Sequence, residues 1–340
     1  MNKILFLLSA IFAIQIANFG QREAKIVDVE KVLLLSYNTL HIVDPEPIDN
    51  IRATTITRLE LPKTNSSDII ISHTGYSFLY KEAYEQSCWI AYELTNRETN
   101  KIFNRTDKFI SDPEVITGTA NNMDYSGSGY DRGHLAPAAD MGWSETSMAE
   151  SFYYSNMSPQ EPGFNRGIWK QLEELVRTWA VENESVYVVT GPVLTFGLST
   201  IGMNKVSVPK YYYKVILDYT DPGIKGIGFI LPNKGSKVPL QEYALTIDSV
   251  EKFTGIDFFP KLPDEQERII ESTITLESWS WKNSSTETVK DNKNVNATER
   301  KPQTDQATRK TASGQIIYTG PRGGRYHFSK SGSKVYERKE

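Results

Sequence analysis

Cysteine and histidine are scarce in this chain of 340 residues, which has one cysteine and four histidines. A single cysteine excludes an internal disulfide, so the fold must be stabilised by burial of apolar side chains. Cys88 itself is followed by Trp89 and is predicted to be a core side chain rather than a nucleophile. The small number of histidines leaves few side chains that titrate near neutral pH.

Long apolar runs are also missing, except at the N-terminus. The run at residues 4–17 follows Lys3 and is shorter than the roughly 20 residues that a membrane span requires. Its flanks are typical of a secretory signal peptide, predicted here as residues 1–20, with an uncleaved anchor as the alternative. We therefore expect a secreted or periplasmic protein with no membrane span in the mature chain.

Positive charge is unevenly distributed. The net charge is −4, but residues 281–340 carry +7, which leaves −11 on the rest of the chain. A nucleic-acid binder with such an acidic main body would rely on positive charge gathered at its cleft, with the basic C-terminal segment as an additional source.

Hydrophobic patterns predict one mixed α+β domain at residues 51–281, after an uninformative N-terminal extension at residues 21–50. The predicted sheet is mainly antiparallel, because a turn-rich connection at residues 220–223 joins two apolar runs. Strands are predicted at residues 185–190, 210–218 and 226–231, and helices at residues 165–181, 247–253 and 264–272.

Composition changes after Trp281. Residues 282–312 have almost no large apolar side chains and are predicted to be a flexible linker. Aromatic residues return at residues 313–340, which are predicted to form a small basic unit of three strands.

The segment Asp131–His134 has the sequence Asp-Arg-Gly-His and is the most informative in the chain. His134 can accept a proton from water at neutral pH, and the Arg132 guanidinium can hold two phosphate oxygens at once. In an extended segment the two side chains lie on the same side, and Gly133 allows close approach of the backbone. The alternative is an Arg–Asp salt bridge with a capping histidine in a loop.

Several motifs in a fixed order accompany this segment and are found at residues 89–94, 105–113, 156–160, 165–173 and 189–192. Together with Asp131–His134 they resemble the DNA/RNA non-specific endonuclease family, the ββα-metal or His-Me finger nucleases of endonuclease G type. The resemblance covers roughly residues 62–260. It implies a ββα-metal finger as active site and a Mg²⁺-dependent hydrolase that leaves 5′-phosphate ends on DNA and RNA.

The resemblance also implies a role for each matching residue. His134 would be the general base, and Asn165 would be the one direct protein ligand of Mg²⁺, for which Mn²⁺ is a possible substitute. Glu173 would orient metal-bound waters. The remaining matches are Asn156, which would position His134 and the phosphate, and Arg132 and Arg105, which would stabilise the pentavalent phosphate.

Helical spacing agrees with this division of roles. In a regular helix Asn165 and Glu173 would stand about 12 Å apart along the axis, so both could hardly bind one ion directly. A single amide ligand suits Mg²⁺, which keeps much of its water. Trp169, between them, is predicted to pack in the core.

The C-terminal unit resembles the small basic adaptor domain first described in large DNA viruses. Arg322 and Arg325 interleave with Tyr318 and Tyr326, a spacing that suits phosphate contact with base stacking. The alternatives are a solubilising tail or attachment to the cell surface or to another protein.

Two other classes of function are alternatives. A catalytically silent nucleic-acid-binding protein, or a surface-anchored effector that uses the basic unit, would keep the motifs without the reaction. A serine hydrolase is disfavoured because the chain has no Gly-x-Ser-x-Gly elbow. A protein inhibitor or a surface partner is a possible additional ligand.

Overall fold

The computed structural model describes residues 52–221 and 223–282, together with four strands nearer the C-terminus. The chain divides into two compact units, Met1–Thr286 and Glu287–Glu340. The division falls inside the segment predicted to be a linker. The predicted signal peptide and N-terminal extension lie outside the described residues. Within the described part of the chain, no helix is both long and apolar enough to span a membrane.

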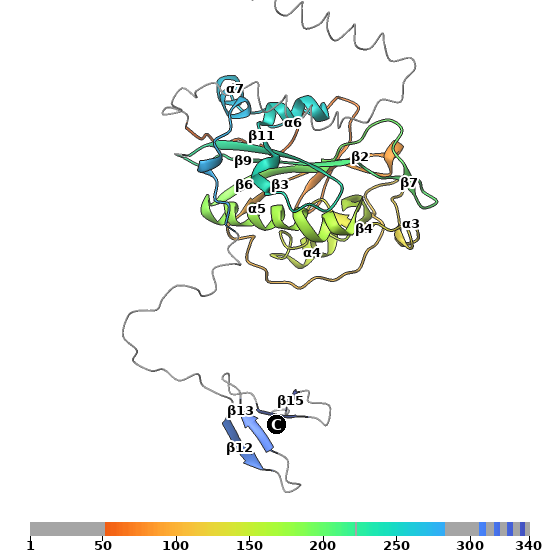
Figure 1. Cartoon of the computed structure of the whole chain (residues 1–340), viewed down its shortest axis with the longest axis vertical. Helices are drawn as coiled ribbons and strands as arrows, with labels where there is room; N and C mark the ends of the chain where they lie inside the picture. The colour runs from red at the N-terminus through yellow and green to blue at the C-terminus, as the bar shows by residue number, and fades with distance from the viewer. Residues whose placement is uncertain are drawn as a thin grey trace, which may run out of the picture. The chain divides into compact units, whose positions relative to one another are not determined.

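A seven-stranded sheet forms the centre of the first unit, with the strand order β1-β2-β3-β6-β9-β10-β11 (Figure 1). Every neighbouring pair is antiparallel. The strands are β1 Ile70–Ser72, β2 Ser77–Lys81, β3 Gln86–Thr95, β6 Ser185–Pro192, β9 Tyr211–Asp218, β10 Lys225–Pro232 and β11 Ala244–Leu245. The three strands predicted from sequence are β6, β9 and β10, and the antiparallel pairing of β9 with β10 is confirmed.

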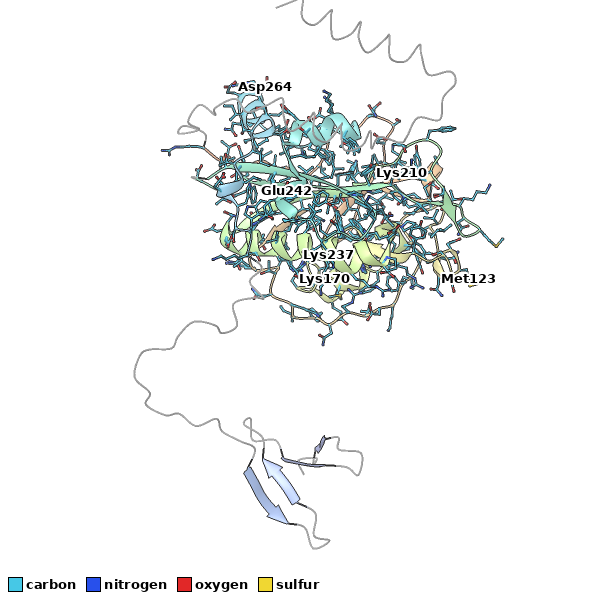
Figure 2. All side chains as sticks on the ribbon, viewed as in Figure 1. Met123, Lys170, Lys210, Lys237, Glu242 and Asp264 are labelled. Atoms are coloured by element: carbon cyan, nitrogen blue, oxygen red, sulfur yellow. The ribbon has the colours of Figure 1, made fainter. Side chains whose placement is uncertain are left out.

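Helices cover both faces of this sheet. Helix α5, Lys170–Glu182, packs on one face, and α6, Ile247–Thr254, and α7, Asp264–Ser272, pack on the other. Figure 2 accordingly places Lys170, at the start of α5, and Asp264, at the start of α7, on opposite sides of the sheet. Because both faces are covered, the central strands are largely apolar and β9 and β10 do not alternate with polar residues, although β9 carries the buried Lys214.

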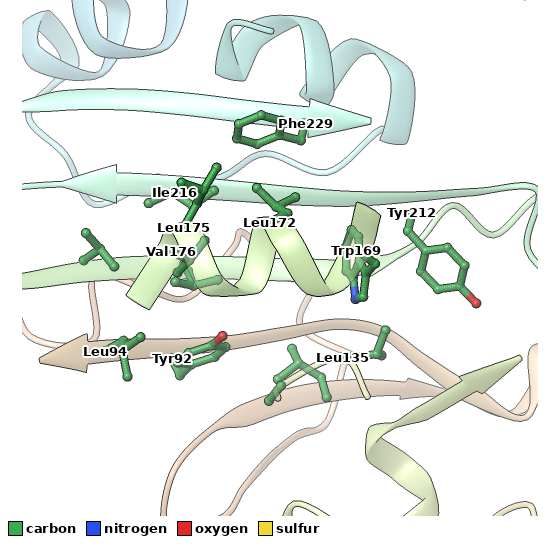
Figure 3. Close-up of a cluster of buried hydrophobic side chains, with 14 of the residues drawn as sticks. Tyr92, Leu94, Leu135, Trp169, Leu172, Leu175, Val176, Tyr212, Ile216 and Phe229 are labelled. Atoms are coloured by element: carbon green, nitrogen blue, oxygen red, sulfur yellow. The ribbon is translucent and has the colours of Figure 1, made fainter. Parts of the chain in front are cut away.

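Each face has its own apolar core. On the α5 side, Leu172 and Val176 pack with Ile216 and Phe229 from the sheet (Figure 3). On the other side, Ile247 and Val250 of α6 and Ile270 of α7 pack with Val215 and Leu217. Successive residues of β9 point to opposite faces. Tyr212 therefore lies in the first core and Tyr213 in the second, and both are fully buried.

Shorter elements complete the first unit. They are η1 Glu82–Tyr84, α3 Asn122–Tyr125, β4 Asp131–His134, α4 Glu145–Glu150, η2 Tyr154–Asn156, β5 Met157–Gln160, β7 Thr200–Ile201, β8 Val206–Ser207, η4 Leu240–Tyr243 and η5 Leu276–Ser278. Strands β4 and β5 pair with each other, as do β7 and β8. The β4–β5 hairpin and α5 are the elements that carry the site.

The helix predicted at residues 165–181 begins later than expected. Residues Phe164–Trp169 form a π-helical turn, and α5 starts at Lys170. Gly167 has φ −110° and ψ −113°, which interrupts the regular helix. The regular stripe expected from Asn165 through Trp169 to Glu173 is therefore wrong for its first turn. Wide turns of this kind are common at functional sites.

The second unit contains a four-stranded antiparallel sheet in the order β12-β13-β14-β15. Its strands are Gln306–Lys310, Ile316–Thr319, Arg325–Phe328 and Lys334–Tyr336. Three strands were predicted, and the additional β12 lies within the segment predicted to be a linker. Low apolar content did not exclude it because an edge strand can pair through its backbone alone.

Candidate nuclease active site

Strands β4 and β5 and the turn that leads into α5 make a compact ββα unit. The pairing places Arg132 opposite Pro159, Gly133 opposite Ser158 and His134 opposite Met157. Gly133 lies so close to the buried Gln160 side chain that a Cβ atom there would be 2.2 Å from its Cδ. The glycine therefore lets β4 pack tightly beneath the histidine that ends it.

The His134 ring is enclosed by two phenylalanine rings. Phe152 meets it edge-on with ring centroids 5.0 Å apart, and Phe109 lies 6.0 Å away. Within the described residues, the ring nitrogen Nε2 is buried and has no hydrogen-bond partner. Burial, with a smaller contribution from the positive charge of Arg105, lowers the pKa of His134 to about 3. The imidazole is therefore neutral at pH 7 and can accept a proton.

Two guanidinium groups lie against these same phenylalanines. The Arg132 Cζ is 5.0 Å from the centre of the Phe109 ring, and the Arg105 Cζ is 5.0 Å from the centre of the Phe152 ring. The Arg132 Nε donates to the Tyr154 hydroxyl at 3.3 Å, and its Nη2 donates to Asn122. The aromatic rings thus hold both cations beside His134, as cation–π contacts do.

Arg105 makes one further contact, with a carboxylate. Its Nε and Nη2 donate to Asp107 Oδ1 at 3.2 Å and 3.0 Å. Both side chains are well exposed, 46% and 64%, so this pair is weak and can open. Arg105 can therefore exchange Asp107 for an anionic ligand at little cost.

Asn156 fixes the backbone that follows His134. Its Oδ1 accepts from Ala136 N at 2.8 Å, while its Nδ2 donates to the carbonyls of Ala136 at 2.9 Å and Ser151 at 2.8 Å. Its own carbonyl accepts from Leu135 N at 3.0 Å. The side chain is fully buried and both amide hydrogens are used. Asn156 is thus a positioning residue, and the expected contact with the phosphate is not supported.

Asp131 joins β4 to the π-helical turn. Its Oδ2 accepts from Asn165 Nδ2 at 2.9 Å and from Arg166 Nε at 2.8 Å, and its Oδ1 accepts from Arg166 Nη2 at 2.6 Å. A carboxylate only accepts hydrogen bonds, so it fixes which end of the Asn165 amide faces it. The amide oxygen of Asn165 is then directed away and is the atom that can bind a cation.

Glu173 lies in a buried network of charges on α5 and its neighbours. Burial raises the pKa of Glu173, and the positive charge of Lys214, then that of Arg177, opposes this shift. Lys214 is 1% exposed, and its Nζ donates to Thr190 Oγ1 at 3.1 Å and lies 4.7 Å from the centre of the Trp169 ring. Lys214 is therefore the group that favours an ionised Glu173.

The same network continues to Asp140. Arg177 Nη1 donates to Asp140 Oδ1 at 2.7 Å, and the Tyr92 hydroxyl donates to Asp140 Oδ2 at 2.8 Å. Asp140 is 1% exposed, so its charge is balanced inside the protein. These bonds anchor α5 to β3 and hold the helix that carries Glu173 in place.

Comparison with known proteins identifies the family to which the chain belongs. Residues 53–265 match the family model described as DNA/RNA non-specific endonuclease. The chain belongs to the DNA/RNA non-specific endonuclease family. The resemblance predicted from the ordered motifs is thereby confirmed.

Curated relatives are identical to this chain at about a third of the aligned residues. It is 35% identical over 228 residues to "Nuclease EXOG, mitochondrial" of Danio rerio, covering 62% of this chain and 66% of that protein. It is 38% identical over 214 residues to "Nuclease C1" of Cunninghamella echinulata var. echinulata, covering 56% and 85%. The chain thus spans just under two thirds of the EXOG relative.

A solved structure in the same family has a similar fold. It is the crystal structure of the EndoG/EndoGI complex, which concerns the mechanism of EndoG inhibition, with a TM-score of 0.55 and 32% identity to this chain. The similarity covers 58% of this chain and 88% of that one. The mixed α+β fold with an antiparallel sheet agrees with the prediction from sequence.

The endonuclease-family site brings together most of the residues predicted from sequence. His134, Arg132 and Arg105 share the Phe109 and Phe152 rings, Asn156 bonds the backbone that follows β4, and Asn165 bonds Asp131, the first residue of β4. Trp169 is fully buried, as predicted. Arg322 lies outside the described residues, and Arg325 begins β14.

Sequence reasoning missed two groups. Lys214 is the one charged residue in the apolar run at residues 211–217 and could have been found by that feature. Arg166 gives no such signal, because an arginine in a turn is ordinarily solvated. Its ion pair with Asp131 depends on the fold.

The low pKa of His134 predicts how stability depends on pH. The folded protein takes up this proton near pH 3 and the unfolded chain near 6.5, so the free energy of unfolding should fall as the pH drops through that interval. His134→Gln should flatten the dependence. Urea denaturation of both proteins between pH 3.5 and 8 measures it. A stability difference that stays constant across this range would contradict the assignment.

Proposed function

We propose that this protein is a metal-dependent endonuclease that hydrolyses phosphodiester bonds of DNA and RNA. The observation that carries the proposal is the neutral His134 ring, with a buried unpartnered nitrogen and a guanidinium against each of its flanking phenylalanines. A base beside two fixed cations suits attack by water on a phosphate. Membership of the endonuclease family and the nuclease relatives support the same reading.

In this mechanism His134 accepts a proton from the attacking water. Burial keeps the ring neutral, so its nitrogen is unprotonated at physiological pH, and the negative charge of a bound phosphate would raise its pKa toward the range of an effective base. Arg132 and Arg105 stabilise the negative charge that grows on the phosphate, and Arg105 releases Asp107 to do so. Asn156 holds the backbone after His134 so that the base keeps its position.

A divalent cation, Mg²⁺ or Mn²⁺ in its place, fits the Asn165 end of the site. The carboxylate of Asp131 holds the amide nitrogen and directs the amide oxygen away, which is how a neighbouring shell orients a metal ligand. Glu173 would act on such an ion through an intervening water. Neutralisation of charge at the phosphate and at the leaving oxygen is the chemistry that the ion supplies when bound.

The proposed reaction needs neither base recognition nor the 2′-hydroxyl. The site groups address the phosphate, so DNA and RNA should both be substrates, with 5′-phosphate ends as products. We also propose that residues 1–20 direct export to the periplasm or medium. Since the solved relative is a complex with an inhibitor, a protein inhibitor is the partner class that we propose for this chain.

Removal of the base should abolish cleavage without unfolding the protein. His134→Gln should lower turnover of plasmid DNA and of RNA by about 10²–10⁴-fold, and EDTA should stop the wild-type enzyme. Gel-based cleavage assays with and without Mg²⁺ measure both effects. Full activity in EDTA would overturn the metal requirement, and near wild-type turnover by the variant would overturn the role of His134.

His73 offers a matched control. Its Nε2 bonds Asp112 Oδ2 at 2.8 Å, and its side chain is only 4% exposed. This histidine is satisfied within the fold, so His73→Gln should lower the unfolding temperature while the folded fraction keeps its turnover. His134→Gln should therefore lower the rate and spare the fold, whereas His73→Gln should lower the stability and spare the rate.

The link from Asp131 to Asn165 predicts the metal requirement. Asp131→Ala should raise the Mg²⁺ concentration for half-maximal cleavage by about 10–100-fold, because the amide is no longer oriented. Asn165→Ala should be rescued only in part by Mg²⁺, and Glu173→Gln should do less harm than Asn165→Ala. Arg166→Ala is the control, because it removes the ion pair with Asp131 and leaves the Asn165 bond. An equal shift for Arg166→Ala and Asp131→Ala would contradict this assignment.

The C-terminal unit predicts a salt effect. The second unit, Glu287–Glu340, carries a net +6, so its deletion should raise KM for long DNA mainly at higher salt and leave turnover at saturation nearly unchanged. The slopes of log KM against log salt for the full and truncated chains decide the matter. Equal slopes would mean that the tail does not contact DNA during cleavage and would favour its role in anchoring or partner binding.

A further inference from the structure

Three carboxyl groups meet on the face of the sheet opposite α5. Asp248 and Glu251 lie on α6 and Glu271 lies on α7, and one oxygen of each is within 4.8 Å of the others. Figures 1 and 2 show α6 and α7 across the sheet from α5, whose N-terminal end leads from Asn165. This cluster is therefore distinct from the nuclease site and has no role in the mechanism above.

Glu271 is the unusual member of the cluster. The residue is 5% exposed, and within the described residues its Oε1 is buried without a hydrogen-bond partner. A buried carboxylate oxygen that lacks a partner is strongly unfavourable. Either a proton or a cation must compensate the buried Glu271 carboxyl group. The charged groups that act on it are carboxylates, which favour both of these outcomes over a bare carboxylate.

The surroundings concentrate negative charge further. Burial is the largest cause that raises the pKa of Glu271, which reaches about 9. The other causes are the negative charges of nearby carboxyl groups, those of Glu251, Glu267, Asp248 and Asp257. Lys63 lies nearby, but its Nζ already bonds Asp257 Oδ2 at 2.8 Å. Lys63 therefore already has a carboxylate partner, and a cation bound at the cluster would relieve the repulsion around Glu271.

Glu251 is held in a defined orientation toward the cluster. Its Oε1 accepts from Phe258 N at 2.6 Å, which fixes the carboxyl group on α6. The carboxyl groups of α6 and α7 thus approach each other from two helices that pack on β10. A cation between them would cross-link the two helices and relieve the repulsion between them.

We propose that Asp248, Glu251 and Glu271 form a structural site for a divalent cation, with Ca²⁺ as the preferred ion. Ca²⁺ binds six to eight oxygens at about 2.3–2.6 Å, so oxygens on opposite sides of it lie up to about 5 Å apart. The carboxyl oxygens of the cluster, which all lie within 4.8 Å of one another, can therefore reach one such ion. Ca²⁺ also accepts an irregular set of carboxylates and waters, whereas Mg²⁺ demands a near-ideal octahedron and keeps several of its waters. Waters supply the remaining ligands.

The test uses the full chain stripped with EDTA and titrated with Ca²⁺ alone, without nucleic acid. Calorimetry should show Ca²⁺ binding by the wild type, and the unfolding temperature should rise with Ca²⁺. Glu271→Gln should weaken binding at least tenfold and abolish the thermal shift. Glu265→Gln on the same helix is the control, because Glu265 is 71% exposed and pairs with Arg268; it should behave as wild type.

Two further variants keep the result interpretable. Asp248 is exposed, so Asp248→Asn tests the site even if Glu271→Gln fails to fold, and it should also reduce the Ca²⁺ shift. Asn165→Ala should retain the shift, which separates this site from the nuclease centre. Wild-type protein without Ca²⁺ binding, or an undiminished shift in Asp248→Asn and Glu271→Gln, would overturn the proposal and leave Glu271 as a protonated acid.

Discussion

The carboxylate of Asp131 is the interaction on which the finger depends. It receives hydrogen bonds from Asn165 and from Arg166, and so ties the first residue of β4 to the π-helical turn before α5. Without that connection β4 would be joined to the turn only by packing and through β5, from which the chain continues into the turn. With it, the hairpin that carries His134 and the turn that carries Asn165 form one rigid piece. Charged hydrogen bonds of this kind are stronger and shorter than neutral ones, which suits a joint that must keep two functional groups aligned.

Around this connection, hydrogen bonds hold the backbone and aromatic rings hold the charged and basic side chains. Asn156 uses its whole amide to hold the backbone after His134, and the phenylalanines at 109 and 152 hold the ring and both arginines. Each of these groups is buried or packed, so the base and the cations have little freedom. Functional groups positioned in this way lose little entropy when a substrate binds. The exposed pair of Arg105 with Asp107 is the one adjustable contact among them.

The sheet has two chemically different sides. On the α5 side, Lys214, Glu173, Arg177 and Asp140 place balanced charges within an apolar core. On the other side, α6 and α7 bring the carboxyl groups of Asp248, Glu251 and Glu271 together, and burial, followed by the surrounding acidic groups, raises the pKa of Glu271. Buried charges are tolerated where opposite charge or hydrogen bonds satisfy them. On the α5 side, groups of the protein itself satisfy the buried charges. On the side of α6 and α7, an ion or a proton must compensate the buried Glu271 carboxyl group.

Sequence by itself determined three of the seven strands of the sheet, β6, β9 and β10, together with α6, α7 and the order of the nuclease-family motifs. Apolar runs bounded by turn residues give strands by local physics, and the ordered motifs identify His134, Asn165 and Glu173 as candidate site residues. Tertiary structure alone decided the π-helical turn, because Gly167 is compatible with a regular helix and departs from one only where Asp131 holds Asn165 and Arg166. It also decided that Asn156 acts on the backbone, that Lys214 faces Glu173, and that Glu271 is buried beside α6. These outcomes depend on contacts between residues distant in sequence, which no local pattern encodes.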